Sequence, residues 1–216
     1  MFDDGVMAVS LADITTLSRL VESVLPVPEP FVDLLPSGGL LRGAMLATAG
    51  PVAQSLAMAL VGPLTQMGSW CAVVGLEELG LLAASELGVE LGRVLVVDEA
   101  DPTRWPATVD ALLDAVEVVL VRAPSQLSAA TASRLVARAR GRGSVLMQVG
   151  SSGSLWPQSP DFTISARSLA WDGIGFGHGH LRARHVEVEV VGRRVGGPAR
   201  HGSIWLPGPD GAVSRR

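Results

Sequence analysis

Short apolar runs alternate with segments of helical periodicity through the middle of the chain. The apolar runs are residues 44–49, 69–75, 92–97, 116–121 and 144–149. The intervening segments, with apolar residues at helical spacing, are 52–66, 77–88, 105–115 and 128–140. Apolar strands separated by helices are typical of a parallel sheet with both faces covered. The pattern therefore predicts an α/β fold with a mostly parallel central sheet flanked by helices, and Ser128 is expected to cap the last helix.

The pattern changes after Gly150. Residues 161–167 (DFTISAR) and 185–191 (HVEVEVV) alternate apolar and polar positions, which predicts antiparallel C-terminal strands. Residues 192–216 are rich in Gly, Pro and Arg and are expected to form a mobile tail.

Prolines divide the start of the chain from the remainder. Residues 11–24 carry apolar side chains at helical spacing, and three prolines follow, at positions 26, 28 and 30. Proline ends a helix and stiffens a linker. We therefore expect three parts: an N-terminal helix and Pro-rich linker over 1–33, a core over 34–191 and a C-terminal tail over 192–216.

Composition excludes several kinds of chemistry. The chain has 216 residues, 48% of them hydrophobic, and a net charge of -4, so neither wholesale disorder nor global attraction to nucleic acid is expected. All 17 basic residues are arginine, and the chain contains no lysine, asparagine or tyrosine. A catalytic or phosphate-binding lysine is therefore excluded. Cys71 lies in the apolar run WCAVVG and is expected to be a buried small residue.

The chain shows neither a secretory signal peptide nor an apolar run of about 20 residues. A cytoplasmic protein without a membrane span is therefore expected.

The first strand-to-helix turn has the setting of a phosphate-binding loop. A working loop reads G-x-x-x-x-G-K-[ST], with glycines that free backbone N–H groups, a lysine for the outer phosphates and a hydroxyl for magnesium. When the frame starts at Gly50, Ser55 replaces the second glycine, Leu56 the lysine and Ala57 the hydroxyl residue. The sequence therefore predicts a vestigial loop.

The second acidic motif of such folds is also missing. An aspartate at the end of an apolar strand supports magnesium in a working site, but here VEVVLV is followed by Arg122. A cation at that place repels a metal ion. The two losses together predict a protein that is not an enzyme and that binds neither a nucleotide cofactor nor a metal.

The ordered segments resemble the RecA ATPase core. They are LLPSGGLLRGAMLATAGP, CAVVGLEE, ASELGVELGRVLVV and VEVVLVRAP, within residues 34–150. GGLLRG is similar to the family's turn into the first core strand, and Glu77 matches the place of its water-activating glutamate. The resemblance implies a degenerate RecA-like P-loop NTPase core.

A second resemblance narrows the family. The stretch WDGIGFGHGHLRARHVEVEV, together with the erased nucleotide loop, is similar to actinobacterial ImuA-type proteins. This resemblance implies a non-catalytic accessory protein of DNA-damage-induced translesion synthesis. Its partners would be an ImuB-like, inactive Y-family polymerase homologue and an error-prone replicative-type polymerase, with RecA a further candidate. Two alternatives stay open: a divergent ATPase, and a SulA-like inhibitor of cell division.

Tryptophans and arginines supply the candidate contact residues. Trp156, Trp171 and Trp205 lie in polar, Gly/Pro-rich surroundings, where partly exposed tryptophan anchors partners; simple packing is the alternative. Arg134, Arg138 and Arg142 share one predicted helical face and are candidate contacts to DNA phosphates, in a weak or indirect interaction. A solvated helix face with favourable C-terminal charge is the other interpretation.

Three further clusters of polar residues have a structural and a chemical interpretation. Glu77 and Glu78 are either a relic base or favourable charge at a helix start. Asp98, Glu99 and Asp101 suit either magnesium or a capped turn. The histidines are either a zinc site or turn residues, and they stand at 178, 180, 185 and 201.

Overall fold

The computed structural model describes residues 23–76, 79–99, 101–150, 156–174 and 178–216. Within them the chain forms a nine-stranded sheet of order β11-β10-β9-β8-β3-β7-β6-β4-β5 and a two-stranded sheet of β1 (Val24–Leu25) and β2 (Leu40–Leu41). The predicted N-terminal helix lies almost wholly outside the described residues. Among the described residues, the longest apolar helices fall short of what a membrane crossing needs.

The centre of the large sheet is parallel, as predicted. Its strands are β3 (Met45–Ala49), β4 (Cys71–Val74), β5 (Val94–Val97), β6 (Val118–Val121), β7 (Val145–Val149) and β8 (Phe162–Ile174). Each of the five apolar runs contains one of the first five strands, and all neighbouring pairs among the six strands are parallel. Continuous apolar character suits strands buried on both faces.

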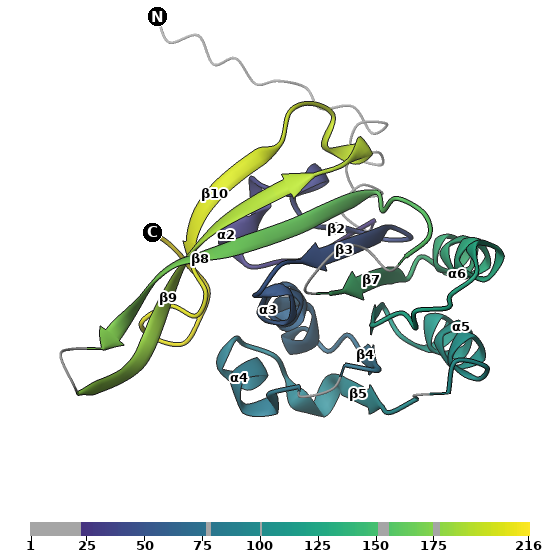
Figure 1. Cartoon of the computed structure of the whole chain (residues 1–216), viewed down its shortest axis with the longest axis horizontal. Coiled ribbons are helices and arrows are strands. Elements are labelled where there is room, and N and C mark those ends of the chain that lie inside the picture. Colours follow the sequence, from purple (N-terminus) through teal and green to yellow (C-terminus); the bar gives the residue numbers. More distant parts are fainter. Residues whose placement is uncertain (1–22, 77–78, 100, 151–155, 175–177) are drawn as a thin grey trace, which may run out of the picture.

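Helices cover both faces of this parallel region (Figure 1). α3 (Ala53–Gln66) and α4 (Leu81–Glu86) contribute to one apolar core, whereas α5 (Trp105–Ala115) and α6 (Ala129–Arg142) contribute to the other. The hydroxyl of Ser128 accepts a hydrogen bond from the Thr131 N–H at 3.1 Å, so the predicted cap of α6 is confirmed. At the other end Gly143 takes the left-handed conformation, φ 73°, which ends the helix.

The C-terminal strands are antiparallel, as predicted. β9 (Gly179–Val191) pairs with β8, and β10 (Arg200–Trp205) joins β9 to β11 (Ser214–Arg215). Residues 192–216 were expected to form a mobile tail, but they contain β10 and β11, and Ile204 and Leu206 are almost wholly buried. The outer halves of β8 and β9, residues 169–174 and 179–184, form an arm that extends beyond the other strands (Figure 1).

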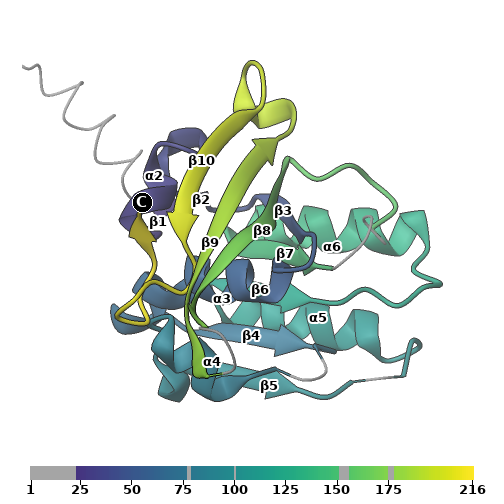
Figure 2. The ribbon, with the colours of Figure 1, turned by 60° about the vertical axis from the view of Figure 1, so that its left-hand side comes forward.

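Short helical elements complete the fold. α2 (Glu29–Val32) lies beside the C-terminal strands (Figure 2), where Arg215 forms ion pairs with Glu29 and Asp33. The single-turn 3-10 helices are η1 (Pro36–Gly38), η2 (Leu91–Arg93) and η3 (Arg193–Val195).

Candidate functional site

The turn between β3 and α3 is too short for a phosphate loop. β3 ends at Ala49 and α3 begins at Ala53. Three residues, 50–52, therefore make the whole connection. Ser55, Leu56 and Ala57, which the motif would place around phosphates, all lie inside the helix.

The packing around this turn closes the site further. Leu56 and Ala57 are each 0% exposed and belong to the core under α3. Gly50 has φ +88°, and a Cβ added there would lie 2.9 Å from the carbonyl oxygen of Ala166 in β8. Glycine is thus required by both conformation and close approach. A lysine at position 56 would point into apolar side chains rather than toward a ligand.

Arg122 follows β6 at the same edge of the sheet, as the sequence places it. Its backbone N–H donates to the carbonyl of Val74 at 3.1 Å, and its side chain is exposed. Within the described part of the chain its guanidinium forms no ion pair.

Two buried polar groups lie near this edge that sequence reasoning missed. The hydroxyl of Thr48 and the side-chain N–H₂ of Gln148 have no hydrogen-bond partner among the described residues. They stand on the neighbouring strands β3 and β7, and the Gln148 carbonyl accepts from the Ala123 N–H at 3.2 Å. Thr48 and Gln148 are polar residues inside apolar runs, and this is the feature of the sequence that could have indicated buried polar groups.

The acidic cluster after β5 forms a capped turn. Asp101 accepts from both the N–H and the hydroxyl of Thr103, at 2.8 Å each, and the backbone bond is the main cause that lowers the pKa of Asp101. Arg104 pairs with Glu99 at 3.2 Å and with Asp101 at 3.3 Å. Among the described residues no three metal-ligand side chains gather. Glu77 and Glu78 lie outside the described residues.

The histidines do not converge. His185 is buried, with its Nε2 2.5 Å from the Ser203 hydroxyl and its ring 5.5 Å from that of Trp205. His178, His180 and His201 are exposed.

The three α6 arginines share one face, as predicted, along a groove against α5. Two of them are already paired: Arg138 and Arg142 reach Asp114 at 2.7 and 2.8 Å. Arg138 is also 3.6 Å from Asp110. In the described part of the chain Arg134 alone of the three forms no ion pair. The groove therefore has less free positive charge than the sequence suggests.

The tryptophans differ in exposure. The expectation that Trp156 is partly exposed is wrong: it is 3% exposed, and its ring centroid lies 6.3 Å from that of Trp105 in the core. Trp171 is 40% exposed on the arm, with the Arg184 guanidinium 4.9 Å above its ring. Trp205 is partly buried between β9 and β11. Trp171 is thus the best placed of the three to meet a partner.

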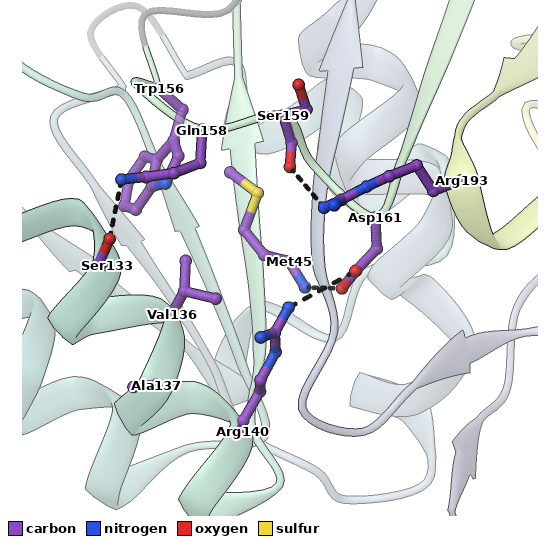
Figure 3. Close-up of a pocket in the computed structure, with 10 residues that line it drawn as sticks. All are labelled: Met45, Ser133, Val136, Ala137, Arg140, Trp156, Gln158, Ser159, Asp161 and Arg193. Atoms are coloured by element: carbon purple, nitrogen blue, oxygen red, sulfur yellow. Dashed lines mark hydrogen bonds and ion pairs between the residues drawn. The ribbon is translucent and has the colours of Figure 1, made fainter. Parts of the chain in front are cut away.

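A cavity of about 440 Å³ lies between α6 and the segment that leads into β8. We call it the α6 cavity (Figure 3). Trp156, Met45 and Val136 provide apolar surface. The side-chain N–H₂ of Gln158 donates to the hydroxyl of Ser133 at 2.9 Å and to the Ala129 carbonyl at 2.7 Å.

The opposite side of the α6 cavity is charged (Figure 3). Asp161 is buried, and its carboxylate accepts from the Met45 N–H at 3.1 Å. Arg140 and Arg194 approach the same carboxylate at 3.6 and 3.3 Å. Arg193 donates to the Ser159 carbonyl at 3.3 Å. This cluster was not predictable from the sequence, because its charged residues come from three separate segments.

The family is established by comparison with known sequences. Residues 33–158 match the model of the MT3502 N-terminal domain. The chain belongs to the MT3502 N-terminal domain family. It is also 38% identical, over 125 residues, to the uncharacterized protein Rv3395c of Mycobacterium tuberculosis. That alignment covers 51% of this chain and 60% of the relative, so the chain spans less than two thirds of the relative's length.

The MT3502 N-terminal domain match covers strands β3 to β7 and helices α3 to α6. It includes the turn between β3 and α3, the α6 arginines and Trp156, whereas strands β8 to β11 follow it. The α6 cavity spans this limit, since α6 lies within the match and Asp161 and Arg193 lie beyond it.

Proposed function

We propose that this chain is a non-catalytic, RecA-like accessory protein of a DNA-damage-induced translesion complex. It acts by binding an ImuB-like, inactive Y-family polymerase homologue. The segments that carry the resemblance to the RecA core support this proposal, because together they supply β3, β4, β5 and β6 of one parallel sheet.

The observation that carries the non-catalytic part is the burial of Leu56 and Ala57 inside α3. Tight binding of a magnesium nucleotide needs a cation and a metal-binding hydroxyl that face the phosphates. Here both positions are wholly buried and the turn before them has three residues. A protein with such a site works through contacts with partners.

The arm supports a role in binding. Four large apolar side chains on it are 40% or more exposed: Leu169, Trp171, Ile174 and Leu181. Two-stranded ribbons gain little stability by themselves in water, and clustered exposed apolar groups mark interaction sites. The arm is therefore the surface on which we place the polymerase homologue.

Co-purification tests the partner. The full chain is expected to retain the ImuB-like homologue, and Trp171→Ala is expected to weaken retention by at least about tenfold, as for an aromatic anchor. Trp70→Ala is the matched control, because Trp70 is 37% exposed under Arg93 yet lies away from the arm. Equal loss of retention in both variants would show that the arm is not the binding surface.

Calorimetry tests the non-catalytic part. Titration with magnesium-ATP is expected to give no binding heat. Micromolar binding would favour the divergent ATPase instead.

A further inference from the structure

We propose that the α6 cavity binds an apolar side chain together with an adjoining carboxylate, supplied by a segment of a protein partner. The source of the ligand rests on the proposed function; the chemistry of the cavity does not.

Positive charge exceeds negative charge around the α6 cavity. Three guanidiniums, those of Arg140, Arg193 and Arg194, surround the single carboxylate of Asp161. Asp161 is already satisfied by a backbone N–H and by two of these arginines. Arg193 has no carboxylate partner among the described residues, and Arg140 is 53% exposed. Donors therefore remain on two guanidiniums that line the cavity.

The α6 cavity as a whole is too large to be a packing gap. Interiors rarely leave voids larger than a water molecule, whereas about 440 Å³ lies within the range of ligand pockets. Trp156 packs against Trp105, and Met45 and Val136 line the cavity beside it. Because Trp156 and Met45 are almost wholly buried, they offer only an edge to the cavity, and Val136 and Ala137 supply the rest of an apolar surface that suits one apolar side chain.

The geometry favours a carboxylate as the charged part. Guanidinium groups bind planar carboxylates through paired N–H donors. Figure 3 shows the Arg193 side chain across the cavity from the Trp156 ring. An acidic group beside an apolar one spans this arrangement, with the carboxylate at the arginines and the apolar group at Trp156.

A titration of the full chain tests the chemistry. The probes are N-acetyl-phenylalanine and its uncharged amide, and the readout is the NMR shift of the Arg193 Nε–H and of the Trp156 indole. We expect the acid to shift both signals and to bind about tenfold more tightly than the amide, which corresponds to one charge-assisted contact. Equal binding of acid and amide, or no shift at about 10 mM, would overturn the proposal.

Variants and a peptide separate the remaining outcomes. Arg193→Gln keeps every contact of Asp161 and is expected to weaken the acid about tenfold. Arg134→Gln, on the outer groove of the same helix, is expected to have no effect. A blocked hexapeptide with a central Phe-Asp pair is expected to bind more tightly than N-acetyl-phenylalanine; equal affinity would overturn the assignment to a protein segment. These results do not depend on whether the polymerase homologue co-purifies, so the two proposals fail separately.

Discussion

The side chain of Leu56 lies in the core beneath the turn where a phosphate loop would hold its lysine. Because α3 begins at Ala53, position 56 faces the apolar layer between the helix and the sheet. A lysine at position 56 would not create a phosphate site, because the backbone of Gly50 packs closely against the Ala166 carbonyl of β8. The length and packing of the whole turn, and not one residue alone, leave no room for a phosphate loop at this position.

Replacement of Leu56 tests this interpretation. Leu56→Lys places an ammonium group in the core, so the free energy of unfolding is expected to fall by at least about 3 kcal/mol. Urea unfolding measures the change, and Leu56→Met, which nearly conserves volume, is expected to cost less than about 1.5 kcal/mol. A stable Leu56→Lys variant that binds ATP would contradict the account.

Ionisation of the buried Cys71 thiol is expected to make the free energy of unfolding depend on pH in the alkaline range. Burial, and next the charge of Glu117, raise the pKa of the Cys71 thiol to about 12. The unfolded thiol ionises at its ordinary value of 9.0. The unfolded state therefore loses its proton first, and the stability present below pH 9 is lost as the pH rises toward 12. The chain has no lysine or tyrosine to mask this effect.

We expect the free energy of unfolding to fall by about 1.4 kcal/mol per pH unit above about pH 9. Urea unfolding at several pH values between about 8 and 11 measures this slope. Cys71→Ala removes the titrating group and should leave the free energy nearly constant over the same range. The same slope in both proteins would show that another group is responsible.

At the scale of elements, the local pattern of apolar and polar residues was sufficient to predict the strands and helices whose formation depends mainly on burial. Strands buried on both faces need continuous apolar residues, so β3, β4, β6 and β7 were predicted from the sequence; the edge strand β5 was predicted too, because its run is equally apolar although Leu95 and Val96 are exposed. Ser128 caps the start of α6 and Gly143 caps its end, each through contacts within a few residues. Because the Ser128 contact is local, it could be predicted from the sequence.

Contacts between distant elements were not predictable in this way. Trp156, in the segment before β8, stands among polar neighbours in the sequence, yet it packs on Trp105 of α5. Arg138 and Arg142 meet Asp114 across two helices. The α6 cavity likewise joins four segments: β3, α6, the segment before β8, and η3. A single sequence carries no record of such partners.

The pairing within α5 and α6 leads to a prediction about DNA. Asp114→Asn frees Arg142 from its ion pair and leaves Arg138 only the longer pair with Asp110 at 3.6 Å, so affinity for a short DNA duplex should rise. The slope of log affinity against log salt should steepen by about one to two. Fluorescence anisotropy over about 50–200 mM salt measures it.

Asp210→Asn is the matched control for this experiment. It makes the same change of charge at an exposed position in the turn between β10 and β11. If both variants bind DNA alike, net charge rather than the α6 groove explains the affinity.

For the whole molecule, the C-terminal strands complete the core instead of extending from it. Val186, Val188 and Val190 of β9 are wholly buried in the same core as α3. β10 pairs with the edge of β9 that β8 leaves free, and Ile204 and Leu206 pack into this core. Stability of the parallel region and of the C-terminal region is therefore shared.

Truncation tests whether these strands are essential to folding. A chain that ends at Val191 loses three buried aliphatic residues, Val195, Ile204 and Leu206. Each buried aliphatic side chain contributes about 1.5–3 kcal/mol, and a whole domain is stable by about 5–15 kcal/mol. The truncated protein should therefore lose cooperative thermal unfolding, because it also exposes β9 as an edge. A chain that ends at Val213 keeps all three residues and should still unfold cooperatively. If the shorter chain melts as sharply as the full one, residues 192–216 are dispensable, and their removal can then map a partner site directly.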